Sequence, residues 1–167
     1  MTLAPTPQID PRGPRFTAGI TLVILAIALI APRPVTITLV ALQTIAFLIG
    51  AARGVQYTPT AYVFRKVIRP RLAAPSELED ARPPRFAQTV GLGFTSLALI
   101  GYASGADLVG AIAVGFAVIA AFLNAVFGFC LGCELYLLIK RISPVSTKQP
   151  VIHHNAETSN NKKEAIA

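Results

Sequence analysis

The sequence predicts an all-α membrane protein with four transmembrane helices arranged as two parallel helix-pair repeats, each followed by a short cytoplasmic amphipathic helix. The composition is 53% hydrophobic and only 14% charged, which is unusual for a soluble domain. Four intervals, residues 16–32, 34–52, 86–106 and 108–133, contain no charged side chain. These two observations predict the membrane class, and an internal repeat predicts the pairing of the helices.

The positions of the four spans follow from the lengths of these intervals. A helix needs roughly 17–25 largely apolar residues to cross a bilayer, at about 1.5 Å per residue. We therefore expect spans at about residues 16–31, 35–52, 86–104 and 108–129. The first is the shortest, so it must stand nearly upright or rely on arginines that reach the interface from its ends. A soluble bundle is disfavoured because residues 22–30 (LVILAIALI) have no polar face.

An internal repeat opens each half of the chain. Residues 10–16 (DPRGPRF) recur as residues 80–86 (DARPPRF), directly before the first and third apolar runs. Proline lacks a backbone N–H and is tolerated in the first turn of a helix. Arginine suits the headgroup region, and phenylalanine suits the hydrocarbon. The motif therefore marks the point where each half enters the membrane.

The repeat continues at the far end of each half, with the register moved by four residues. Residues 54–70 align with residues 128–144, and the two segments share a glycine, a tyrosine, a lysine and a closing proline. In the first half, Thr58 and Pro59 are expected to be the N-cap and the first residue of the short helix. Because two crossings return the chain to its starting side, the halves should be parallel repeats about an axis along the membrane normal.

The basic residues predict the orientation in the membrane. Of the fifteen lysines and arginines, only Arg33 lies between the first and second spans or between the third and fourth. Short loops rich in these residues stay in the cytoplasm. We expect residues 1–15 to be a cytoplasmic segment, residues 16–143 the membrane domain with a cytoplasmic loop at 53–85, and residues 144–167 a disordered cytoplasmic tail. The expected location is the inner (cytoplasmic) membrane, with several spans and both termini in the cytoplasm.

Polar side chains outside the cysteine motif lead to two further expectations. Ser76 and Glu79 fit a capping box for one short helix in the 53–85 loop. Within the spans, Gln43, Thr44 and Asn124 are expected to form hydrogen bonds between helices, because an unpaired polar group is costly in hydrocarbon. The basic loop can contact anionic lipid, whereas no recognition motif predicts nucleic-acid binding.

The only two cysteines, Cys130 and Cys133, are the candidate redox pair, with Glu134 as a candidate modulator. Cys-x-x-Cys is the spacing of dithiol redox motifs. A structural disulfide is not expected in the reducing cytoplasm. A zinc site usually takes four ligands, and the others would have to come from Glu134, the tail histidines or a second subunit. We therefore assign no metal site and no cofactor.

Two local structures are compatible with the cysteine pair. If the chain breaks at Gly128 or Gly132, Cys133 lies in the first turn of a terminal helix, where the helix dipole favours its thiolate. Glu134 would oppose this effect with its negative charge. If the fourth helix is unbroken, Cys130 and Cys133 share one helix face at i, i+3 spacing.

Several of these segments together resemble a known family. Residues 10–16, residues 82–88 (RPPRFAQ), and Asn124 leading into residues 127–134 (FGFCLGCE) are similar to an uncharacterised family of bacterial four-helix integral membrane proteins that carries a domain-of-unknown-function label. The resemblance covers roughly residues 8–144. Members are often encoded near thioredoxin-like or rhodanese-like proteins, so the resemblance implies a thiol-redox or sulfur setting. It supplies no catalytic residue.

Two functional classes fit the sequence. In the first, thiol-redox or sulfur handling, Cys130 and Cys133 exchange electrons or persulfide sulfur with a soluble thioredoxin-like or rhodanese-like cytoplasmic protein. In the second, the protein is a non-catalytic membrane scaffold or small-solute channel, as a monomer or a homo-oligomer, and the cysteines pack or bind metal. Whether either class is an enzyme is left open. A hydrolase is disfavoured, because two tail histidines and eight acids provide no Ser/His/acid arrangement.

Overall fold

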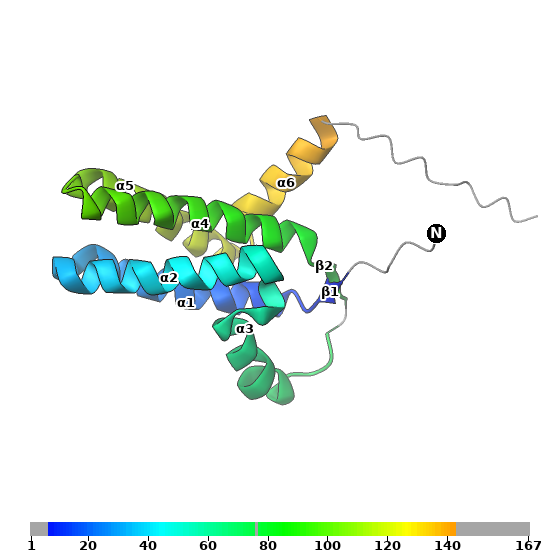
Figure 1. The fold of residues 1–167 in the computed structure, drawn as a ribbon. Coiled ribbons are helices and arrows are strands. Elements are labelled where there is room, and N and C mark those ends of the chain that lie inside the picture. The colour runs from blue at the N-terminus through cyan, green and yellow to red at the C-terminus, as the bar shows by residue number, and fades with distance from the viewer. Residues whose placement is uncertain (1–6, 76, 143–167) are drawn as a thin grey trace, which may run out of the picture.

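Four long helices, packed side by side, make up most of the structure (Figure 1). The computed structural model describes residues 7–75 and 77–142. In chain order the long helices are α1 (Arg12–Ile30), α2 (Arg33–Arg53), α4 (Arg82–Ala103) and α5 (Asp107–Phe122). Each is long and apolar enough to cross a membrane, when α5 is taken with the helical turn η4 (Leu123–Phe127) that extends it. The chain is therefore a multi-pass integral membrane protein, as the sequence predicted.

The four helices form a closed ring of contacts. α1 packs against α2, α2 against α4, α4 against α5, and α5 against α1. Short turns at residues 31–32 and 104–106 join the helices of each pair at one end, here named the turn end. The opposite end contains residues 128–130 and is named the cysteine end.

Helices α1 and α4 each begin four residues earlier than the predicted spans. Pro14 and Pro84 lie in their first turns, where a backbone N–H has no helical partner to lose. α1 has 19 residues, which at 1.5 Å per residue is about 28 Å and close to the roughly 30 Å of a bilayer core. The first span is therefore a full-length helix, and it gains this length from the arginine-proline motif.

An aspartate supports the start of each of these two helices. Asp10 Oδ1 accepts a hydrogen bond from the backbone N–H of Arg12 at 3.0 Å. Asp80 Oδ1 accepts the corresponding bond from Arg82 at 2.9 Å. A carboxylate near a helix N-terminus also interacts favourably with the helix dipole. The repeated motif thus forms the same local structure twice.

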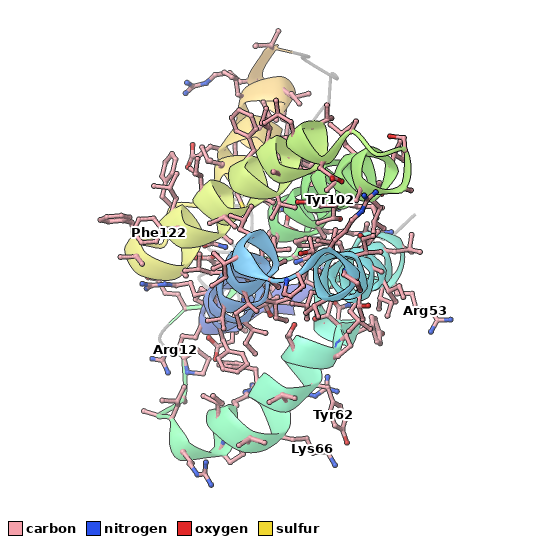
Figure 2. The ribbon with its side chains drawn as sticks, turned by 90° about the vertical axis from the view of Figure 1, so that its left-hand side faces the viewer. Arg12, Arg53, Tyr62, Lys66, Tyr102 and Phe122 are labelled. Carbon is pink, nitrogen blue, oxygen red and sulfur yellow. A yellow bond between two sulfur atoms is a disulfide. The ribbon has the colours of Figure 1, made fainter. Side chains whose placement is uncertain are left out.

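Small side chains fill the interior, and many large apolar side chains face outward. Leu25, Val40 and Val114 are fully buried, together with several alanines. At Gly101, a Cβ atom would lie 2.7 Å from the backbone nitrogen of Gly110, so α4 and α5 approach closely there. The exposed large side chains include Phe122, which points away from the bundle (Figure 2). This distribution suits helices that pack through small residues and face lipid with large ones.

The polar residues of the second span behave differently from each other. Gln43 Nε2 donates to Thr21 Oγ1 on α1 at 3.1 Å, which confirms the expected hydrogen bond between helices. Thr44 Oγ1 instead donates to the carbonyl of Val40 in its own helix at 2.7 Å, so the expectation was wrong for this residue. A threonine hydroxyl reaches the carbonyl four residues earlier without any partner helix.

An ion pair connects the two helix pairs at the turn end, which faces the viewer in Figure 2. Arg33 Nη1 lies 3.6 Å from Asp107 Oδ2. Arg33 Nη2 also donates to the carbonyl of Tyr102 at 2.6 Å. Arg33 and Asp107 are the first residues of α2 and α5.

Short elements at the cysteine end follow α2 and precede α4. They are η1 (Val55–Tyr57), α3 (Pro59–Val63), η2 (Phe64–Ile68), η3 (Arg69–Arg71) and β2 (Glu79–Asp80). β2 pairs antiparallel with β1 (Gln8–Ile9), and Ile9 lies opposite Glu79. The predicted capping box is therefore wrong, because backbone pairing with β1 places Glu79 in a strand; its other member, residue 76, lies outside the described residues.

The last described element is α6 (Leu131–Ile142). α3 and α6 lie at the same end of the bundle and project to opposite sides of it (Figure 1). Tyr62 is on α3 and Lys66 is on η2, which follows it. Lys66 Nζ lies 5.4 Å from the centroid of the Tyr62 ring, and both side chains point away from the bundle (Figure 2). The predicted tail at 144–167, with its histidines, lies outside the described residues.

Candidate functional site

The helix of the fourth span ends at Gly128, directly before the cysteines. Gly128 has a left-handed backbone conformation with φ 70° and ψ 11°, and its N–H donates to the carbonyl of Asn124 at 3.1 Å. Glycine adopts a positive φ without steric cost and commonly ends helices. The chain then turns, and α6 begins at Leu131. The alternative with a break at Gly128 is confirmed, and the alternative with an unbroken helix is wrong.

Cys130 is the N-cap residue of α6. Its carbonyl accepts the first helical hydrogen bond, from the N–H of Glu134 at 3.0 Å. Its Sγ accepts a hydrogen bond from the N–H of Cys133 at 3.3 Å. These are the two bonds of an N-cap, with sulfur in place of the usual oxygen. The sequence alignment placed Gly132 at the N-cap. It did not show that the segment from Gly128 to the cap is two residues shorter than the segment from Gly54 to Thr58 in the first half.

Cys130 and Cys133 are joined by a disulfide in the first turn of α6. Their Cα atoms are 5.1 Å apart, within the range that a disulfide spans. A structural disulfide was not expected from the sequence; the bond forms here because the turn from Cys130 into α6 brings two residues three apart into contact. Both cysteines are half-buried, and Glu134 is exposed.

Close packing on α4 holds this turn in place. A Cβ atom on Gly132 would lie 2.6 Å from the Cα and Cβ atoms of Ala87. One helical turn further along, the rings of Tyr136 and Phe86 are 5.8 Å apart between centroids. The cysteine pair therefore lies on an element that is positioned by direct helix contact.

A cavity of about 430 Å³ lies beside the cysteine pair, between α6 and the long helices. Its lining is mostly apolar and includes Phe94 and Phe116, with Gln88, Asn124 and Cys130 among its few polar groups. Cys133 is not part of the lining. Within residues 7–75 and 77–142, Asn124 forms no side-chain hydrogen bond to another helix, so the expected interhelical bond is absent there. Neither Gln88 nor the cavity was predicted, because their juxtaposition depends on the packing of distant segments.

No metal-binding cluster is present around the pair in the described part of the chain. Among those residues, no three His, Cys, Asp or Glu side chains come close enough to hold a metal ion. Glu134 therefore does not combine with the two cysteines in this way. The arrangement combines a local disulfide, a helix N-terminus and an adjoining apolar cavity. Chemically, a disulfide can exchange with a thiolate that reaches one of its sulfur atoms.

Comparison with known proteins identifies a family. The family model described as Domain of unknown function (DUF4395) matches residues 9–141. No curated protein and no solved structure matches the chain. The matched segment contains all four long helices, both arginine-proline motifs and the cysteine pair.

Proposed function

Because the chain belongs to the family described as Domain of unknown function (DUF4395), whose description assigns no activity, we propose a function from the site itself. Cys130 and Cys133 form a disulfide–dithiol couple at a membrane surface and exchange two electrons with a soluble thioredoxin-like protein. The observation that carries this proposal is the disulfide between half-buried cysteines at the start of α6. A pair that only filled space would not need this bond.

The N-cap geometry favours attack at Cys133. A thiolate of the reduced partner attacks Cys133 Sγ, a mixed disulfide forms, and Cys130 leaves as a thiolate. The N–H of Cys133, 3.3 Å from Cys130 Sγ, and the α6 dipole stabilise this leaving group. A better-stabilised thiolate leaves faster. The second thiol of the partner then resolves the mixed disulfide, and Cys130 and Cys133 are left as two thiols.

The proposed location of the couple is the cytoplasmic face of the inner membrane. Among the described residues, every lysine and arginine except Arg33 lies either in the part of a long helix at the cysteine end or on a short element that adjoins this end. Short basic segments stay in the cytoplasm. The test is labelling with a membrane-impermeant maleimide after mild reduction. We expect labelling in opened vesicles, and labelling in intact cells would contradict the orientation.

We also propose that the two halves are structural repeats about one axis along the membrane normal. Two pairs of residues at corresponding places in the halves lie beside each other. Ile9 lies opposite Glu79 in the strand pair, and Arg33 pairs with Asp107 at the turn end. An axis that relates the halves would place each residue near it beside its own counterpart.

Arginines of the repeated motif support the same relationship. Arg15 Nη2 donates to the carbonyl of Val126, at the end of the fourth span, at 3.4 Å. Arg85 Nη2 donates to the carbonyl of Ala52, at the end of the second span, at 2.8 Å. Ala52 and Val126 each lie two residues before the glycine that ends their span, so each half closes the last helical turn of the other half.

The experiment that tests the couple is a redox titration of the purified full chain in glutathione buffers. We expect a reversible two-electron couple that Cys130→Ser and Cys133→Ser each abolish. With the oxidised parent chain and a reduced thioredoxin-like protein that lacks its resolving cysteine, the mixed disulfide should form mainly on Cys133, as peptide mapping by mass spectrometry would show. A mixed disulfide mainly on Cys130 would contradict the proposed direction of attack. If both thiols remain free at every redox potential, the redox proposal fails and the scaffold or channel class replaces it.

A further inference from the structure

We propose that the cavity beside Cys130 binds a lipid-soluble quinone, which accepts the electrons of the reduced cysteine pair. This inference rests on the proposed redox couple and names its second partner. Cavities that bind small molecules are typically about 300–1,000 Å³ and mostly apolar, with a few polar groups that orient the ligand. The cavity of about 430 Å³ falls in this range.

The location of the cavity restricts the solubility of its ligand. Its walls come mainly from α1, α4 and α5, which cross the membrane, and from the first turn of α6. The aromatic rings of Phe47, Phe94 and Phe116 contribute to the lining. A ligand that reaches this space from the bilayer must be apolar, and a flat ring suits a site lined by aromatic side chains.

Two amide side chains in the lining suit the carbonyl oxygens of a quinone. Gln88 and Asn124 each carry an NH₂ group that donates hydrogen bonds. Gln88 is held close to α2, because a Cβ atom on Gly50 would lie 2.7 Å from its Oε1. A lipid acyl chain has no acceptor for these donors, so the polar part of the lining favours a quinone over a bound lipid tail.

The two cysteines divide the chemistry between the cavity and the surface. Cys130 lines the cavity and Cys133 does not. The Cys130 thiolate attacks the quinone ring and forms a C–S bond. Cys133, as a thiolate, then attacks Cys130 Sγ, so that the S–S bond forms and the C–S bond breaks, leaving its electron pair on the ring. Two electrons pass from the dithiol to the quinone, and the two thiol protons end on the quinol oxygens. Cys133 is thereby available again to the soluble partner.

The test mixes the reduced, purified full chain with a short-tailed ubiquinone analogue under anaerobic conditions. We expect one quinol and one Cys130–Cys133 disulfide per chain. Asn124→Leu and Gln88→Leu should each raise the half-saturating quinone concentration about tenfold, the loss expected for one buried hydrogen bond. Ala120→Phe, which fills the cavity and keeps both amides, should have at least the same effect. Thr44→Val, outside the cavity lining, is the matched control and should behave as the parent protein does.

A glutathione titration of each variant separates this inference from the proposed function. A normal couple with no quinol formed overturns the quinone site and leaves the redox function standing. Quinol formation that Asn124→Leu, Gln88→Leu and Ala120→Phe all leave unchanged would mean reaction with quinone dissolved in detergent, and it also overturns the site. Absence of the glutathione couple in the parent overturns both proposals. If one of the three cavity variants unfolds, its redox titration in glutathione will differ from that of the parent, and the test then rests on the other two variants.

Discussion

The two halves of the chain leave the membrane in the same way and differ in the residue that starts the next helix. The second and fourth spans both end at a glycine with positive φ, Gly54 at 114° and Gly128 at 70°. Gly54 donates its N–H to Gly50, and Gly128 donates to Asn124. The short helix that follows is then capped by Thr58 in the first half and by Cys130 in the second.

The two caps form the same pair of hydrogen bonds. The Thr58 carbonyl accepts from Tyr62, and Thr58 Oγ1 accepts from Ala61 at 3.2 Å. Cys130 does both with its carbonyl and its sulfur. A hydroxyl is a stronger acceptor than sulfur, so capping alone does not explain a cysteine. On the proposed redox function, the second half has a weaker cap acceptor in exchange for a thiol that can react.

The surroundings of the two caps differ in the same direction. Thr58 is only 1% exposed, and its hydroxyl also donates to the carbonyl of Val55 at 2.9 Å. Cys130 borders a cavity and has a second cysteine within bonding distance. The first cap is enclosed by its own hydrogen bonds, whereas the second borders a cavity.

The largest expected effect on stability comes from Gly132→Ala, which tests whether the second cap needs its close contact with α4. A new Cβ atom would lie 2.6 Å from the backbone of Ala87, so α6 must move. We expect a loss of about 1–3 kcal/mol, measured by detergent unfolding followed by circular dichroism. Gly93→Ala is the matched control, since no atom lies within 4 Å of its new Cβ. Equal stability of the two variants would contradict the packing described here.

Substitutions at the two cap residues, Thr58 and Cys130, should have the next largest effect on stability and should differ from each other. Thr58→Ala removes the acceptor for Ala61 and should cost about 1 kcal/mol. Cys130→Ser, compared with the reduced parent, should be neutral or slightly stabilising, because an oxygen cap replaces a sulfur cap. The same unfolding assay measures both. A large loss of stability in Cys130→Ser would mean that the cysteine has a packing role.

A smaller effect is expected at Glu134, whose negative charge opposes the thiolate. Glu134→Gln should raise the alkylation rate of the reduced pair at neutral pH about two- to fivefold, which corresponds to a surface charge effect near a helix N-terminus. The measurement is iodoacetamide alkylation followed by mass spectrometry as a function of pH. Glu77→Gln, which is far from the cysteines in the sequence, is a control for the change in net charge. An unchanged rate would show that the Glu134 side chain points away from the sulfur atoms.

The smallest effect is expected where the halves meet at the turn end. Arg33→Gln removes the ion pair with Asp107. The Arg33 side chain is 52% exposed and the Asp107 side chain is 54% exposed. Exposed pairs contribute about 0–1 kcal/mol, and the difference should shrink as salt is added. Unfolding at low and high salt measures it. A loss well above this range would mean that the hydrogen bond from Arg33 to the Tyr102 carbonyl is the important contact.

Local features of the sequence determined the membrane class, the four spans and the start of α3 at Thr58 and Pro59. Hydrophobic length, proline in a first turn and an N-cap residue all act within a few residues, so they can be predicted without knowing which segments pack together. The starts of α1 and α4 were predicted four residues late, because the arginines of the motif were counted as lying outside the helix.

Only the tertiary structure decided the features that make the site. The choice of a break at Gly128 over an unbroken helix, the cap at Cys130 and the cavity that Gln88 and Asn124 share depend on how α6 packs against α4. The strand pairing of Ile9 with Glu79 likewise joins segments far apart in the chain. Apolar spans of similar composition can pack in many registers, and the choice among them is made by close contacts such as Gly132 on Ala87, which exist only after the helices have come together.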